Sequence, residues 1–93
     1  MSPVPLEIPP RFKKQLGKKA PQLQDAVIEC VERLGDNPRH PSLQTHELGS
    51  CKGVFEAYVD KANRITFHYE RRQGQRYIVL RKHCNHDMLG RNP

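Results

Sequence analysis

The sequence predicts an α+β domain, with two N-terminal helices packed on one face of an antiparallel sheet of three to four strands. Helical periodicity is confined to residues 11–35, whereas three runs of alternating apolar and polar residues occupy positions 54–83. The chain has 93 residues, of which 35% are hydrophobic, enough for one small core. We therefore expect a single domain over residues 1–93.

Two segments carry the helical pattern. In residues 11–19, Phe12 and Leu16 lie one turn apart, which predicts a short amphipathic helix. Pro21 marks the start of a second helix, where its missing N–H costs nothing, and Gly35 is placed to end it. Apolar residues recur between them at three- and four-residue steps: Leu23, Ala26, Val27, Cys30, Val31 and Leu34. The second helix is therefore expected to form the core.

The segments outside the periodic runs are irregular. Residues 1–10 are rich in proline, so we expect an irregular arm, or a short edge strand at residues 5–8. Residues 36–53 form a turn-rich connection that Leu43 and Leu48 would pin to the core. Connections of this kind, held on a rigid scaffold, often carry function.

Residues 54–60, 64–70 and 76–83 alternate as strands do, and short connections suit hairpins between them. One face would pack against the helices through Phe55, Ala57, Val59, Ile65, Phe67, Tyr69, Ile78 and Leu80. The other, which we call the second face, would carry Glu56, Tyr58, Asp60, Arg64, Thr66, His68, Tyr77, Arg81 and His83. These side chains suit an anion-binding surface. The alternative is a simply solvated sheet face, of which His68 would be an incidental member.

Charge and composition narrow the function further. The formal net charge is +6 and the pI about 9.6, which favours an anionic partner, either a nucleic acid or an acidic protein segment. No apolar run is long enough to cross a bilayer, and prolines stand where a signal peptide would be apolar. We expect a cytoplasmic protein without a membrane partner, a disulfide framework or a cofactor.

A zinc site is the metal alternative, since Cys51, His83, Cys84 and His86 are available. Structural zinc sites usually show two spaced pairs of ligands. This sequence has one tight cluster and no second pair. We expect no metal.

The ordered motifs of the chain resemble the RelE/ParE toxin superfamily, nearest its YafQ- and HigB-like ribonucleases. The resemblance rests on NPRHPSLQTHELGS, then a strand, then NRITFHYE, then IVLRKHCNHDML, and covers about residues 10–90. It implies two helices on a curved antiparallel sheet. It also implies a toxin of a type II toxin–antitoxin system that cleaves mRNA, usually on the ribosome, and is silenced by a cognate antitoxin, which we expect to be acidic.

The resemblance also assigns roles. Arg64 matches an arginine that stabilises the scissile phosphate, His86 matches a catalytic histidine after the last strand, and His46 matches a further functional histidine. Arg81 and Lys82 form the basic end of the last strand. Classical RelE carries lysines on the first long strand, where this chain has Glu56, Tyr58 and Asp60.

These residue types suit RNA cleavage by the 2′-hydroxyl. Histidine can move the protons because it titrates near working pH, and the arginine fork binds a phosphate through two hydrogen bonds. We expect catalysis by His86, Arg64 and His46, assisted by Arg81. Substrate contacts would come from Lys82, Tyr58, Tyr77, His83 and Asp60.

Purely structural roles are the alternative for the same residues. Arg64 would pair with Glu56 or Asp60 across the hairpin, Asp60 would cap the turn, and His46 and His86 would serve loop geometry. At the level of the whole protein, the alternatives are a noncatalytic RelE/ParE-like binding module, for example one that targets gyrase, and an RNA-binding domain without activity.

Overall fold

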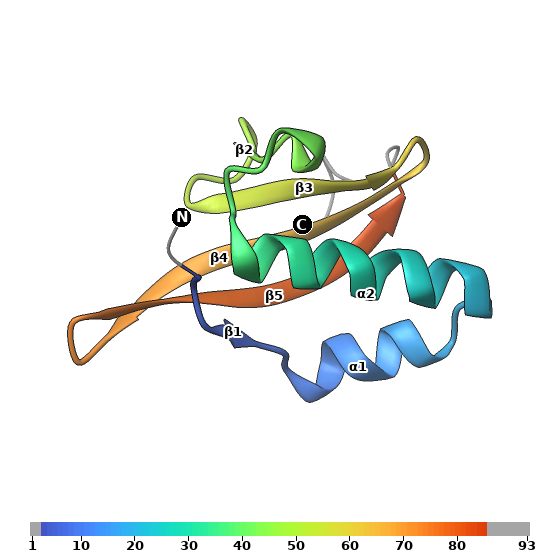
Figure 1. Cartoon of the computed structure of the whole chain (residues 1–93), viewed down its shortest axis with the longest axis horizontal. Helices are drawn as coiled ribbons and strands as arrows, with labels where there is room; N and C mark the ends of the chain where they lie inside the picture. The colour runs from blue at the N-terminus through green and yellow to red at the C-terminus, as the bar shows by residue number, and fades with distance from the viewer. Residues whose placement is uncertain (1–2, 86–93) are drawn as a thin grey trace.

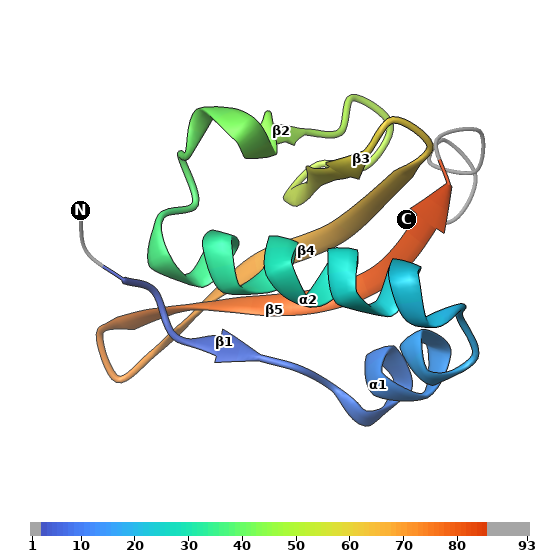
Figure 2. The same ribbon diagram turned by 45° about the vertical axis from the view of Figure 1, so that its right-hand side comes forward.

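The computed structural model describes residues 3–85, so His86 lies outside the described residues. Two helices cover one face of a single twisted sheet (Figures 1 and 2). The elements are β1 (Leu6–Glu7), α1 (Pro10–Gly17), α2 (Pro21–Asp36), a 3₁₀ turn η1 (Pro41–Leu43), β2 (His46–Glu47), β3 (Val54–Asp60), β4 (Asn63–Arg72) and β5 (Gln75–Asn85). No helix in the described part is long and apolar enough to span a bilayer.

The sheet has the order β1-β5-β4-β3-β2. The predicted fold class is confirmed, and the strands β3, β4 and β5 pair antiparallel as expected. Two further strands of two residues each extend the sheet, β1 parallel to β5 and β2 antiparallel to β3. The edge strand expected in the proline-rich arm is β1, which pairs through Leu6 and Glu7 with Ile78 and Val79.

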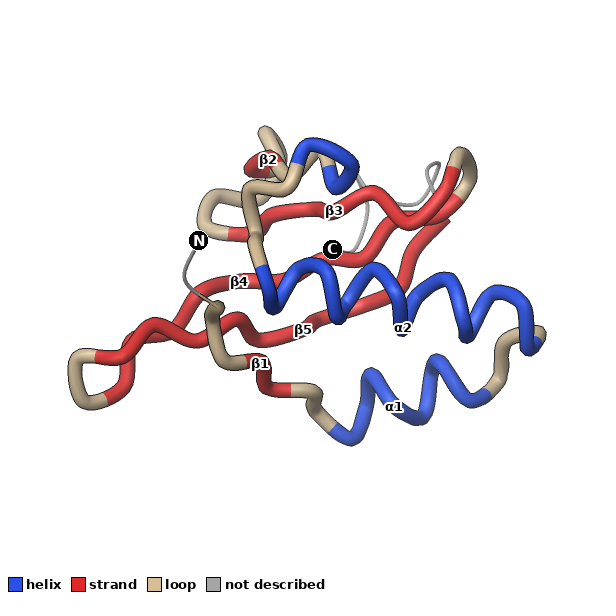
Figure 3. The backbone as a smooth tube through the Cα atoms, viewed as in Figure 1, coloured by secondary structure: helices blue, strands red, loops and turns tan. Residues whose placement is uncertain are grey.

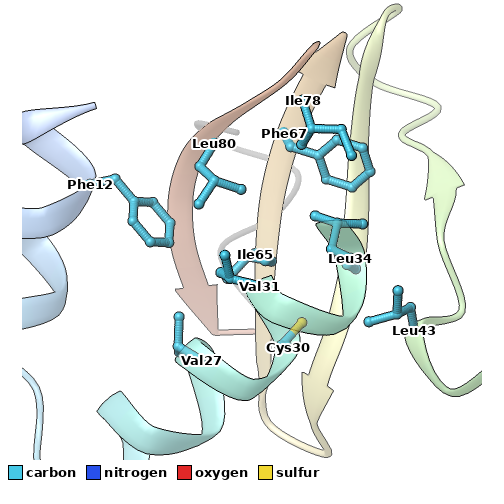
Figure 4. Close-up of a cluster of buried hydrophobic side chains, with 11 residues drawn as sticks. Phe12, Val27, Cys30, Val31, Leu34, Leu43, Ile65, Phe67, Ile78 and Leu80 are labelled. Atoms are coloured by element: carbon cyan, nitrogen blue, oxygen red, sulfur yellow. The ribbon is translucent and has the colours of Figure 1, made fainter. Parts of the chain in front are cut away.

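The core lies between α2 and the helix face of the sheet. Val27, Leu34, Ile65 and Phe67 are fully buried there, and Figure 4 shows α2 pointing its apolar side chains at β4 and β5. Phe12 of α1 closes the same cluster. The helical and strand periodicities thus meet in one core.

Gly35 has a different role from the one expected. It lies inside α2, which ends at Asp36, so it does not terminate the helix. A β-carbon at this position would lie 2.8 Å from Cδ1 of Leu6, and the Gly35 carbonyl accepts a hydrogen bond from Val4 N at 2.8 Å. The glycine lets the N-terminal arm pass close to the helix.

The β4–β5 hairpin projects beyond the rest of the sheet (Figure 3). Gln73 and Gly74 form its two-residue turn, with φ of 52° and 78°. Positive φ at both positions matches the twist of the flanking strands.

A β-bulge interrupts the pairing of β4 with β5. Thr66 pairs with Lys82 whereas Phe67 pairs with Leu80, so Arg81 is the extra residue on β5. Each residue beyond the bulge changes face relative to simple alternation. His83 therefore lies opposite Ile65, on the helix face, and its predicted place on the second face is wrong.

Candidate functional site

The second face carries one polar residue from each of four neighbouring strands in a single row. The register pairs His46 with Glu56, Glu56 with Thr66, and Thr66 with Lys82. Neighbouring strands lie about 4.8 Å apart, so this row crosses most of the sheet. We call it the polar row.

The strongest contact in the polar row joins His46 to Glu56. His46 Nε2 lies 2.9 Å from Glu56 Oε1, and His46 Nδ1 lies 2.9 Å from the carbonyl oxygen of Gln44. Both ring nitrogens thus face oxygens that accept hydrogen bonds. These two contacts fix the orientation of the imidazole ring at the edge of the polar row.

Burial separates the two partners. The Glu56 side chain is 7% exposed, whereas the His46 side chain is 58% exposed. Glu56 Oε2 is buried and has no hydrogen-bond partner among the described residues. The centre of the second face is therefore not the solvated surface of the alternative interpretation: Glu56 and Thr66 are both buried.

Arg64 lies one step along the sheet from the polar row, next to the β3–β4 turn. Its Nη1 donates to the carbonyls of Asp60 at 2.6 Å and Asn63 at 3.0 Å, and its guanidinium stacks 4.6 Å from the Tyr58 ring centre. The alternative role for Arg64 is an ion pair with Glu56 or Asp60; no such pair occurs among residues 3–85, and the contact with Asp60 is to its backbone carbonyl. Nε and Nη2 keep their donors without a protein partner in residues 3–85, and these can bind a phosphate.

Asp60 caps the β3–β4 turn, one of the two roles considered for it. Its Oδ1 accepts from the backbone N of Ala62 and from both the backbone and side-chain nitrogens of Asn63, at 2.8–3.0 Å. Burial alone would raise the pKa of Asp60, but these hydrogen bonds lower it. The carboxylate thus holds the turn that positions Arg64.

Arg81 is held by a chain of polar contacts on the other side of the polar row. Its Nη1 donates to His68 Nδ1 at 3.2 Å, and His68 Nε2 donates to Glu70 Oε2 at 2.8 Å. Glu70 in turn accepts from Arg72, which also binds Glu7 at 2.6 Å. Hydrogen bonds from His68 and Arg72 lower the pKa of Glu70.

His68 is therefore more than an incidental residue, contrary to the sequence interpretation. Arginine can only donate, so Nδ1 of His68 accepts and Nε2 carries the proton. The spacing of His68 and Glu70, two residues apart on one strand, could have indicated the contact between them. The contact with Arg81 could not be foreseen, because it depends on the bulge.

The helix face holds His83. Gln15 of α1 bonds both its backbone N and O, at 2.9 and 2.7 Å, and its Nε2 lies 2.8 Å from Asn63 Oδ1. Burial, followed by the charge of Lys19, lowers the pKa of His83. The residue fastens α1 to the sheet, and the substrate role predicted for it does not fit this place.

Cys30 and Cys84 do not offer a nucleophile, and His83 and Cys84 do not form a metal-binding pair. His83 and Cys84 are neighbours on β5 and lie on opposite faces, so they do not face one ion. Burial raises the pKa of Cys84, and it raises that of Cys30 to about 11, so both thiols stay protonated at neutral pH. Within residues 3–85, no three His, Cys, Asp or Glu side chains form a metal-binding group.

The structure thus brings part of the predicted set together. His46 and Lys82 lie in the polar row, and Arg64 and Arg81 flank it, with Tyr58 under Arg64. Tyr77 pairs with Glu70, six residues from Arg64 along β4, which is about 20 Å. It lies outside this group, under Arg72. The described chain ends at Asn85, which pairs with Asn63, while Cys84 pairs with Arg64; His86 is the next residue in the sequence.

No protein-family model matches the sequence, and no curated protein matches it. Solved toxin structures, in contrast, share the fold. The YoeB/ParE toxin from Agrobacterium tumefaciens has a TM-score of 0.69 at 8% identity, covering 89% of this chain and 99% of that one. The toxin–antitoxin complex RelBE2 from Mycobacterium tuberculosis gives 0.68 at 18%, with 90% and 99% covered. YafQ from Escherichia coli gives 0.61 at 14%, with 92% and 97% covered. The fold expected from the resemblance is confirmed: the chain has the RelE/ParE-type toxin fold.

Proposed function

We propose that this protein is the toxin of a type II toxin–antitoxin pair and cleaves mRNA, on the ribosome, through attack of the 2′-hydroxyl on the adjacent phosphorus. The contact between His46 and Glu56 carries the proposal, because it couples an exposed histidine to a buried carboxylate on a basic sheet face. The toxin fold supports it.

Cleavage needs one proton removed and one supplied. The 2′-oxygen loses its proton as it bonds to phosphorus, and the 5′-oxygen leaves with a proton. We assign the supply of the second proton to His46, whose ring is oriented by Glu56 Oε1 and the Gln44 carbonyl. We assign the role of the base to His86. This residue follows Asn85, the last described residue of β5, and the preceding Cys84 pairs with Arg64. The products are a 2′,3′-cyclic phosphate and a free 5′-hydroxyl.

The extra charge on the phosphate would be stabilised from both sides of the polar row. Arg64 offers Nε and Nη2 from the turn side, and Arg81 is oriented by His68 from the other. Lys82 lies in the row itself and adds a third cation. Preorganised donors of this kind need no rearrangement as the charge develops.

The test is primer extension on cellular mRNA after induction, with His46→Ala and Arg64→Gln compared with the wild type. We expect cleavage to fall about 10²–10⁴-fold for His46→Ala and about 10²–10³-fold for Arg64→Gln. Matched controls are His83→Gln, which changes a histidine on the helix face, and Arg33→Gln, which changes an arginine on α2.

Two outcomes separate the alternatives. Equal cleavage by His46→Ala and His83→Gln would contradict the assignment of the site. A wild-type protein that binds RNA without cutting it would favour a noncatalytic module instead.

The net charge of +6 also supports an acidic antitoxin as partner. α1 and the residue pair after it carry Arg11, Lys13, Lys14, Lys18 and Lys19 and no carboxylate. Co-purification with the product of the neighbouring gene, weakened by added salt, would support this partner. Absence of a complex at low salt would contradict it.

A further inference from the structure

A cavity lies on the helix side of the sheet, away from the polar row. It has a volume of about 510 Å³, within the range of small-molecule sites. The connection after α2 forms one wall and the start of β5 the other, over a floor of two aromatic rings. Its lining is Pro38, Arg39, His40, Pro41, Gln44, Thr45, Phe55, Tyr69 and Arg76.

The charged side chains that line this cavity are all positive. Arg39 and Arg76 line it, and no carboxylate does. Their guanidinium groups make no hydrogen bond or ion pair with any residue in the described range, whereas those of Arg33, Arg64 and Arg72 are bonded. Two unpaired arginines in one hollow suit an anion that can receive their donors.

Aromatic rings give the cavity a second recognition element. Phe55 and Tyr69 meet edge to face, with ring centres 5.3 Å apart, and Arg76 stacks 4.3 Å above Tyr69. The rings of Phe55 and Tyr69 offer an apolar surface for a base, and Arg76 places a cation beside it. Together these features suit a flat ring that carries a phosphate.

The cavity wall also contains two unusual features. Thr45 Oγ1 is buried and has no hydrogen-bond partner among the described residues. Gln44 has φ of 47°, in the left-handed region that non-glycine residues rarely adopt. Such features often mark binding sites.

We infer that this cavity binds one nucleotide of a single-stranded RNA, with the phosphate on Arg39 and Arg76 and the base on the aromatic floor. Thr45 lines the cavity, and the next residue, His46, belongs to the polar row. Since β2 is the edge of the sheet, an RNA strand that passes over β2 can reach both the cavity and the polar row. The inference rests on the proposed function for the choice of RNA.

The experiment measures binding rather than cleavage. A fluorescent 2′-O-methyl oligoribonucleotide, which lacks the attacking hydroxyl, is titrated by anisotropy against the wild type and against Arg39→Gln/Arg76→Gln. The matched control, Arg33→Gln/Lys52→Gln, removes the same charge at positions outside the cavity and the polar row. We expect the dissociation constant to rise about tenfold or more for the cavity variant and less than about threefold for the control. The salt slope should be smaller by about 0.7 in the cavity variant, because one phosphate contact is lost.

Each outcome decides the inference. Equal weakening by the two double variants would overturn it, because only overall charge would then matter. Adenosine 5′-monophosphate should shift the amide resonances of Thr45, Phe55 and Tyr69. Shifts equal to those from inorganic phosphate would exclude the base contact, and binding of the mononucleotide without the oligonucleotide would exclude RNA. Absence of cleavage by the wild type, with oligonucleotide binding to the cavity intact, would reject the nuclease proposal and keep this site.

Discussion

The two faces of β3, β4 and β5 are built from the same strands and follow different rules. The helix face is apolar, and Ile65, Phe67 and Ile78 alternate along it as period two requires. The second face buries Glu56 and Thr66 at its centre, and its layout depends on a bulge. Stability comes mainly from the first face, whereas the candidate chemistry depends on irregular features of the second.

The largest effect should come from the helix face. Phe67→Ala removes a fully buried ring between α2 and the sheet. We expect the free energy of unfolding to fall by about 3–5 kcal/mol, a large share of the stability of a domain this small. Urea unfolding measures it. Thr66→Ala, one residue away on the second face, should cost much less; an equal loss would erase the difference between the faces.

Deleting the bulge residue should separate stability from activity. Without Arg81, Lys82 still pairs with Thr66 and Leu80 with Phe67, so the ladder becomes regular and no core residue moves. We expect a change of ~1–2 kcal/mol in the free energy of unfolding, with cleavage strongly reduced because Arg81 is lost.

Deleting Val79 is the control for this deletion. With pairing maintained beyond the bulge, it would place Arg81 opposite Phe67, in the core, and Leu80 opposite His68, outside it. That variant should not fold, as judged by circular dichroism. Equal stability of the two deletions would show that the bulge does not set the register.

The contact between His46 and Glu56 should show a modest coupling in stability. A double-mutant cycle with His46→Ala and Glu56→Gln should give about 1 kcal/mol or less, because His46 is more than half exposed. The same pair should matter far more for cleavage. A coupling of zero in both measurements would remove the role assigned to Glu56.

The smallest effect should be the pH dependence that His83 contributes. Burial keeps the folded-state pKa below the ordinary 6.5, so between these values the unfolded chain binds more protons. The free energy of unfolding therefore falls as the pH decreases through this window. His83→Gln should flatten the change between pH 7 and pH 5 in urea unfolding. An unchanged slope would contradict the buried, neutral state of His83.

Periodic elements could be predicted from the sequence, and isolated ones could not. The helix from Pro21 and the three long strands repeat their pattern often enough to be recognised. The core residues could be predicted from the same patterns. β2 has two residues, too few for any period, so the partnership of His46 with Glu56 was out of reach although both residues were noted. The sequence also gives no sign that β5 carries an extra residue at this point, and the presence of that residue reverses the face of His83.

The short outer strands have a consequence for how copies of the protein meet. The long strands, β4 and β5, lie inside the sheet, and the two outermost strands have only two residues each. Pro5 and Pro9 flank β1 and lack the N–H that a neighbouring chain would need. The hairpin that projects past them carries Arg71 and Arg76, whose like charges repel a second copy. The molecule thereby resists aggregation through its own β-structure.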